Sequence, residues 1–358
     1  MRGLVLGIAA ALASCAGGAA DSTGGETTSA STSSGGETSG SATTDETTTG
    51  TSGGVVGWET VLKVGTDHGA FLSVWGRAPD EVYAVGGQIL DGSSVGMVYV
   101  HDGATWSEVA LPAATPSLNW VTGVEEDVWV VGYEGAALRR EGGEFVAHPV
   151  ATASMLWGIW GASSTDLWAV GGDGVDDAPI LFHWDGASWS PAAIPTLDEG
   201  CHGLFKVWGS AADDVMVVGD FGVTLHWDGA SWSQIESGSI TDLISVWGKG
   251  GPDAMVAVGG RANGRIARWD GAAWTALTTS LPGLSGVWVD SEGGATAVGW
   301  QGTIVTIADA TFDTVAEESG TIHLLHATFG FDGGPRYAVG GSLQGPPPYV
   351  GVILRSEE

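Results

Sequence analysis

A segment of about 40 residues recurs seven times along this 358-residue chain, and this repeat constrains the fold more than any other feature. The fullest copies contain an apolar stretch ending in Val-Trp-Gly, a second stretch ending in Ala-Val-Gly or Val-Val-Gly, a third ending in Trp-Asp-Gly, and a final Trp-Ser. The glycine that ends the second stretch marks the seven copies: Gly86, Gly132, Gly171, Gly219, Gly259, Gly299 and Gly340.

Each copy breaks into four short apolar segments separated by glycine or by Asp-Gly. Asp-Gly is a hairpin signal, because glycine tolerates positive φ and the aspartate side chain bonds its own backbone. Four short strands in a repeat of this period are typical of a propeller blade. The sequence therefore predicts an all-β, seven-bladed β-propeller with four-stranded blades.

The two ends of the repeat region are complementary. The seventh copy stops near Arg355 after three strands, whereas residues 57–61 resemble a fourth strand that lacks its first three. We expect the N-terminal strand to complete the last blade and close the ring, which removes an open sheet edge. The propeller domain is then predicted to span residues 55–358.

The N-terminus is typical of a secretory signal peptide, predicted for residues 1–14. Arg2 precedes an apolar run from Leu4 to Leu12 that is too short to span a bilayer. The following Leu-Ala-Ser-Cys resembles the bacterial lipobox, which implies cleavage before Cys15 and lipidation of that residue, palmitate included. The resemblance implies an extracytoplasmic lipoprotein, and Ala16 after the cysteine favours the outer membrane.

Residues 15–54 carry the lipidated cysteine and a Ser/Thr/Gly-rich stretch. This stretch contains no aromatic residue and no hydrophobic period. Such a composition buries too little apolar surface to offset the entropy of ordering. We therefore expect a disordered tether between the membrane and the propeller.

The repeats resemble several known propeller families. The Gly86-Gly87 step, followed by Tyr99 and Trp106, is similar to kelch repeats. The Ala-Val-Gly … Asp-Gly-x-x-Trp pattern resembles the propellers of photosystem II assembly factors and of Asp-box proteins. The resemblance covers residues 55–358 and implies the fold. It does not define the function, because propellers carry unrelated activities.

The formal net charge is −30, from 12 basic and 42 acidic residues. A surface this negative repels phosphate backbones, which excludes nucleic acid as an expected partner. It also leaves no basic patch for anionic lipid. We therefore expect membrane contact through the lipid anchor only.

The 18 tryptophans fall into two groups. Those that recur in register are expected to pack between blades. Trp120, Trp157 and Trp300 occupy positions that hold no tryptophan in the other copies. Because function is expected where repeats differ, these three are the candidate ligand-binding residues.

No cofactor is predicted. Asp173, Asp176 and Asp177 stand on a glycine-containing loop and could hold Ca²⁺, but they lack the ligand ladder of an EF-hand, so a solvated turn is the preferred interpretation. The spacing of His323 and His326 places them on opposite faces of a strand, which argues against a shared metal. Cys201 is expected to be a buried, inert thiol.

The chain shows no nucleophile elbow, zinc motif or phosphate-binding loop. The predicted function is therefore a non-catalytic, membrane-anchored binding or scaffolding propeller of the cell envelope that recognises a protein partner. One alternative is a carbohydrate-binding propeller that uses the three unrepeated tryptophans on a glycan. A further alternative is a propeller hydrolase or lyase with an unrecognised site.

Overall fold

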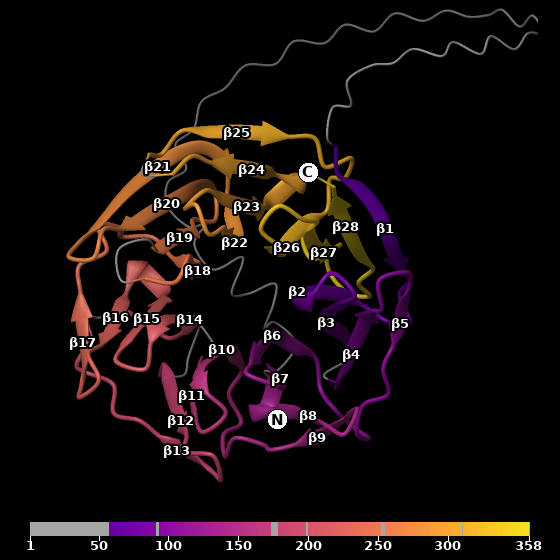
Figure 1. Cartoon of the computed structure of the whole chain (residues 1–358), viewed down its shortest axis with the longest axis horizontal. Helices are drawn as coiled ribbons and strands as arrows, with labels where there is room; N and C mark the ends of the chain where they lie inside the picture. Colours follow the sequence, from indigo (N-terminus) through magenta and orange to yellow (C-terminus); the bar gives the residue numbers. More distant parts are fainter. Residues whose placement is uncertain are drawn as a thin grey trace, which may run out of the picture.

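The computed structural model describes residues 57–90, 93–172, 178–197, 200–251, 255–309 and 311–357. Over these residues, 28 strands form seven antiparallel sheets of four strands each. Figure 1 shows the sheets arranged as blades around a central axis, in chain order. The predicted seven-bladed propeller is confirmed.

Six of the blades are built from four consecutive strands, with the first strand nearest the axis. Blades 1 and 2 are β2 (Ala70–Ala78), β3 (Glu81–Leu90), β4 (Ser93–His101) and β5 (Trp106–Glu108), then β6 (Leu118–Val124), β7 (Asp127–Gly132), β8 (Ala137–Glu141) and β9 (Glu144–Ala147). Blades 3 and 4 are β10 (Leu156–Ser163), β11 (Asp166–Gly171), β12 (Ile180–Trp184) and β13 (Trp189–Pro191), then β14 (Leu204–Ala211), β15 (Asp214–Gly219), β16 (Thr224–Trp227) and β17 (Trp232–Ile235). Blades 5 and 6 are β18 (Leu243–Gly248), β19 (Met255–Gly259), β20 (Asn263–Trp269) and β21 (Trp274–Pro282), then β22 (Leu284–Val289), β23 (Ala295–Gly299), β24 (Ile304–Ile307) and β25 (Thr314–Glu317).

Blade 7 joins the two ends of the chain. It contains β26 (Leu324–Gly330), β27 (Arg336–Gly341), β28 (Gly351–Ser356) and β1 (Glu59–Val64), and β1 pairs antiparallel with β28. In Figure 1 the indigo β1 lies beside the yellow β28. Trp58, just before β1, is buried, and its indole N–H donates to Glu317 Oε2 of blade 6 at 2.8 Å. The predicted ring closure by an N-terminal strand is confirmed.

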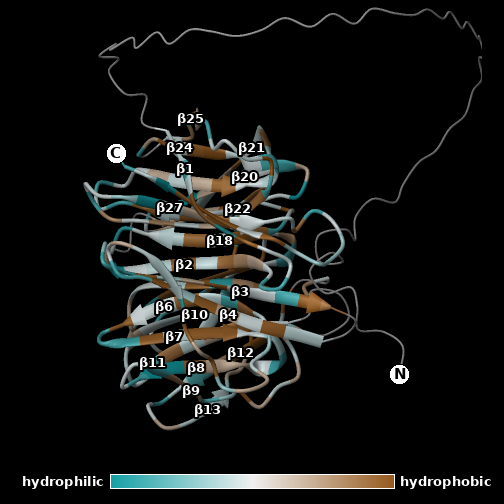
Figure 2. Ribbon diagram, turned by 90° about the vertical axis from the view of Figure 1, so that its right-hand side faces the viewer, coloured by the Kyte–Doolittle hydropathy of each residue, from teal (hydrophilic) through white to brown (hydrophobic). Residues whose placement is uncertain are grey.

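The antiparallel order gives the ring two faces with different connections. One face carries the links between the second and third strands of each blade and the links between blades, and we call it the loop face. The turn face carries the remaining hairpin turns. Three 3-10 turns lie on the loop face: η1 (Tyr133–Gly135), η2 (Asp220–Gly222) and η3 (Trp300–Gly302). Figure 2 shows β3 and its partner β4 extending beyond the other strands on the loop face, at the right, and the tip of β3 is hydrophobic. No helix in the described part of the chain is long and apolar enough to cross a membrane.

The Asp-Gly turns of the turn face form as the sequence predicts. In each, the aspartate Oδ1 accepts backbone N–H bonds from the residues two and three positions further on, and the glycine has φ between +88° and +94°. These backbone hydrogen bonds lower the pKa of each turn carboxyl. The four aspartates are Asp102, Asp185, Asp228 and Asp270.

Aromatic contacts join neighbouring blades near the axis. The Trp75 ring of blade 1 lies over Gly123 of blade 2, where any side chain would overlap with it. The Trp160 ring of blade 3 lies in the same way over Gly209 of blade 4. The Val-Trp-Gly signature thus supplies both the ring and the space that receives it, and these repeated tryptophans pack between blades as predicted.

A second set of aromatic contacts lies further from the axis. Trp129 of blade 2 packs against Trp184 and Trp189 of blade 3, with ring centroids 5.3 and 5.9 Å apart. Trp168 of blade 3 packs in the same way against the paired tryptophans of blade 4. Aromatic pairs of this kind contribute about 0.5–1.5 kcal/mol each beyond the burial of their surface.

Substituting Gly123→Ala should lower the free energy of unfolding by about 1–3 kcal/mol, because the added methyl group displaces the Trp75 ring from the blade 1–blade 2 junction. Chemical denaturation measures this change. Gly345→Ala is the matched control, because a methyl group there meets only a carbonyl oxygen at 4.0 Å. Equal stability of the two variants would contradict the junction described here.

Candidate functional site

Aromatic side chains fill the centre of the ring. Phe329 of blade 7 lies 6.2 Å from Trp75 of blade 1, 6.0 Å from Trp247 of blade 5 and 6.3 Å from Trp288 of blade 6, measured between ring centroids. Contacts among blades this far apart in the ring require the rings to meet at the axis. Aromatic rings of blades 5, 6, 7 and 1 are therefore packed together near the axis at this level.

A polar layer lies in the same interior. Lys206 on β14 is 2% exposed, and its ammonium donates to the Trp157 carbonyl oxygen at 2.5 Å. The Nζ atom also lies 4.4 Å from the centre of the Trp120 ring, a cation–π contact between blades 4 and 2. Burial lowers the pKa of Lys206 to about 7, and no described carboxylate pairs with it.

His326 on β26 is the second base of this layer. Its ring Nδ1 lies 2.7 Å from the Leu72 carbonyl oxygen, and a neutral ring donates its proton there. Burial, with the charge of Lys206, lowers the pKa of His326 to about 4. Two further interior atoms, Asn119 Oδ1 and Ser245 Oγ, have no hydrogen-bond partner. Polar side chains of the first strands therefore gather inside the ring, with Lys206 buried and His326 partly buried.

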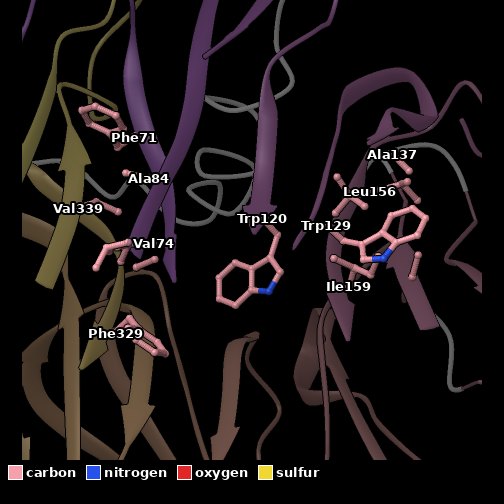
Figure 3. Close-up of a cluster of buried hydrophobic side chains, with 14 of the residues drawn as sticks. Phe71, Val74, Ala84, Trp120, Trp129, Ala137, Leu156, Ile159, Phe329 and Val339 are labelled. Carbon is pink, nitrogen blue, oxygen red and sulfur yellow. The ribbon is translucent and has the colours of Figure 1, made fainter. Parts of the chain in front are cut away.

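The three tryptophans proposed as ligand-binding residues do not form one surface. Trp120 is 6% and Trp157 is 8% exposed, and both contact Lys206 in the interior. Figure 3 shows Trp120 on its strand, within the buried core cluster that also contains Phe329 and Trp129. Trp300 stands at the start of η3, as predicted for a connecting loop, and packs partly buried against Leu72 and its neighbours. A ligand-binding role for the three residues stays a prediction.

The loop face carries exposed apolar side chains. Among the described residues, large hydrophobic side chains that are exposed lie either on the loop face or on fourth strands at the rim. Ile240 and Ile322 are the most exposed of them, at 84% and 82%. The loop-face members are Leu90, Val95, Phe221, Ile240 and Ile322, and those at the rim are Val146, Leu277 and Val315.

Ile240 and Ile322 occupy equivalent places in blades 4 and 6. Each ends a Glu-Ser-Gly-x-Ile loop, residues 236–240 and 318–322, three positions before the leucine that pairs with the register glycine of the next blade, Gly259 or Gly340. In both loops the serine hydroxyl donates to the carbonyl of the residue two positions on and accepts that residue's N–H. The loop backbone therefore folds without any contribution from the isoleucine.

A 3-10 turn packs against each of these loops. A side chain on Gly222 of η2 would meet Ser239, and one on Gly302 of η3 would meet Thr321. We call each combination of turn and loop a turn-and-loop unit: residues 220–222 with 236–240 in blade 4, and residues 300–302 with 318–322 in blade 6. An open depression in the blade 6 unit is lined by Gln301, Gly302 and residues 317–322.

Phe221, at the centre of η2, has left-handed backbone with φ of 52° and a side chain that is 49% exposed. A bulky residue in this conformation is uncommon and costs about 1 kcal/mol or more. The equivalent residues in η1 and η3, Glu134 and Gln301, are polar and equally left-handed. The turn therefore does not require an aromatic residue, and its presence on the surface points to a contact outside the fold.

A charged cluster holds the Phe221 turn. The Phe221 N–H donates to Asp242 Oδ1 at 3.1 Å, and Arg261 pairs with Asp242 through its Nε. Asp220 Oδ2 accepts the His202 N–H at 3.2 Å, and burial beside Asp242 raises the pKa of Asp220 to about 6. The carboxylates thus fix the backbone that presents Phe221.

The remaining candidates from the sequence lie elsewhere. Cys201 is partly buried, and burial raises its thiol pKa to about 12, consistent with the expected inert thiol. Asp173, Asp176 and Asp177, like Cys15, lie outside the described residues. Within the described ranges, no group of three or more histidine, cysteine or acidic side chains is placed to hold a metal ion.

Sequence reasoning missed the two turn-and-loop units and the interior positions of Lys206 and His326. The recurrence of Glu-Ser-Gly-x-Ile is visible in the sequence, but it does not show that the isoleucine is exposed. Lys206 was visible as a charge inside an apolar inner-strand segment. Its contact with Trp120, two blades away, depends on the closed ring, so the sequence around either residue does not predict it.

No family model matches the chain, and no curated protein sequence matches it. Three solved structures share its architecture of a seven-bladed propeller. Virginiamycin B lyase from Staphylococcus aureus, a catalytically inactive form with quinupristin, is 12% identical with a TM-score of 0.63, over 83% of this chain and 98% of that one. YCF48 bound to D1 peptide is 13% identical with a TM-score of 0.61, over 84% and 97%. YCF48 from Cyanidioschyzon merolae is 13% identical with a TM-score of 0.60, over 84% and 98%. At this identity the likeness shows the fold alone.

The lowered pKa of His326 gives a pH prediction. The unfolded chain binds a proton at this residue below about pH 6.5, whereas the folded protein binds one only below about pH 4. The free energy of unfolding should therefore fall by about 3 kcal/mol from this residue as the pH is lowered from 6.5 to 4. His326→Gln, which keeps a donor for the Leu72 carbonyl, should remove this component in urea titrations at the two pH values. An identical pH dependence in both proteins would contradict a neutral, partly buried His326.

Proposed function

We propose that the protein is a non-catalytic binding propeller that recognises a protein partner through its loop face. The observation that carries the proposal is the pair of equivalent loops that expose Ile240 and Ile322 without using them in the fold. Leaving such a side chain in water forgoes about 1.5–3 kcal/mol of burial. Exposed apolar groups gathered on one face are typical of protein interaction sites.

The occupant that fits is a protein segment with apolar side chains. The two isoleucines and Phe221 offer separated anchors, which suit side chains spaced along one chain. A structural neighbour, YCF48, is described with a bound peptide, and this supports peptide binding on a propeller of this architecture. Lys206 is 2% exposed, which does not favour a catalytic role for this interior base.

We also propose that Cys15 anchors the protein to a bacterial membrane in an extracytoplasmic space, with the outer membrane favoured. Fourth strands run from the turn face to the loop face, so β1 begins at Glu59 on the turn face. A tether that joins there would leave the loop face directed away from the anchor. The partner is then expected among envelope proteins.

Cys15→Ser should move the protein from the membrane fraction to the soluble fraction, because it removes the acceptor of the acyl chains. Fractionation followed by immunoblotting measures the distribution. Unchanged membrane association of this variant would contradict the lipid anchor, without bearing on the loop face.

The loop-face proposal is tested by Ile240→Ser combined with Ile322→Ser. Loss of two anchors worth about 1 kcal/mol each should reduce partner binding about tenfold or more. The measurement is a cross-linked pull-down from intact envelopes, in which proteins captured by the wild type are quantified for each variant.

The matched control is Val315→Ser, which removes a 66% exposed residue from the rim strand β25. The proposal predicts that the loop-face variant loses the captured protein while the rim variant and the wild type retain it. Equal capture by all three proteins at unchanged melting temperature would overturn it.

A further inference from the structure

The two turn-and-loop units carry a charge as well as an apolar group. Each loop begins with an exposed glutamate, Glu236 in blade 4 and Glu318 in blade 6, four positions before the exposed isoleucine. No ion pair joins either glutamate to a described basic residue, whereas Glu317 beside Glu318 is paired with Arg336. The same two chemical groups, one carboxylate and one apolar side chain, are therefore presented twice on one face.

The loops do not need these glutamates for their own folding. The serine hydroxyls close both loops, and glycines with φ of +70° and +66°, Gly238 and Gly320, allow the chain to turn. In the equivalent connection of blade 2, Thr152 contacts the η1 turn and is followed by an exposed alanine, Ala153. The fold therefore accepts a loop that lacks the glutamate and the isoleucine.

From this repetition we infer that the partner segment is basic as well as apolar, with cationic side chains that pair with Glu236 and Glu318 while apolar side chains cover Ile240 and Ile322. The inference rests on the proposed function and names the chemistry of its partner. The net charge of −30 favours approach of a cationic segment from a distance. The two glutamates would then fix its position along the face, because charge pairs at an interface set register more than affinity.

The spacing of the units adds a geometric requirement. Blade 5 lies between them in the ring, so a single segment must cross it to reach both. Two weak contacts on one segment act together, because binding at the first unit raises the effective concentration at the second. Substitution in both units should therefore weaken binding more than substitution in either one.

The experiment measures fluorescence anisotropy of two synthetic probes added to the full-length protein. One probe alternates lysine with leucine and the other alternates glutamate with leucine. The wild type should bind the lysine probe and not the glutamate probe. Glu236→Gln with Glu318→Gln should weaken binding of the lysine probe by about tenfold, the loss expected for two exposed ion pairs.

A charge-matched control distinguishes a local effect of Glu236 and Glu318 from the general attraction of a cationic probe to an acidic protein. Asp80→Asn with Glu292→Gln removes the same charge from exposed residues in turn-face loops. The inference predicts little change for this control at moderate salt. Equal weakening by the two double variants would overturn it, because the effect would then come from net charge alone.

A third variant distinguishes the inference from the proposed function. If Ile240→Ser with Ile322→Ser abolishes probe binding while the glutamine variant binds like the wild type, the loop-face function stands and the basic partner is overturned. If the isoleucine variant binds the probe like the wild type, the proposed function itself fails. Weakening by both loop-face variants and not by the control supports both statements.

Discussion

The contact between an aromatic ring of one blade and a glycine of the next is the interaction on which the structure depends. Trp75 over Gly123 and Trp160 over Gly209 repeat the same geometry, and Trp129 and Trp168 extend it outward. A blade buries these surfaces only when its neighbour is present, so an open array would leave one aromatic face in water at each end. Closure by β1 removes both exposed ends at once.

The same packing decides where function can reside. Rings that join the blades also meet near the axis around Phe329, and the same interior holds Lys206, which is buried, and His326, which is partly buried. The turn face carries four Asp-Gly turns whose aspartates accept hydrogen bonds from nearby backbone N–H groups. The loop face differs from blade to blade and exposes Ile240 and Ile322. For this reason the recognition of a partner that we propose is assigned to the loop face.

Sequence predicted the elements that repeat and follow local rules. These elements are the register glycines, the Asp-Gly turns, the packing role of the tryptophans and the closing strand near Trp58. Each depends on the repeat period or on turn chemistry, and comparison of the copies makes both visible in the sequence. Exposure does not follow from such rules. Isoleucine is a residue type typical of protein cores, so the sequence does not show that Ile240 and Ile322 are exposed to solvent. Their exposure is seen only once the serine-closed loops are known. The Lys206–Trp120 contact joins blades 4 and 2, and requires the closed ring before it exists.

The central claim is that one partner lies across the two turn-and-loop units of the loop face. Site-specific photo-crosslinking in intact envelopes tests it most directly, with a photoreactive residue placed at position 240, at position 322 or, on the turn face, at position 292. The account predicts that positions 240 and 322 crosslink to the same protein and that position 292 does not. Crosslinking of that protein from position 292, or of unrelated proteins from positions 240 and 322, would contradict it.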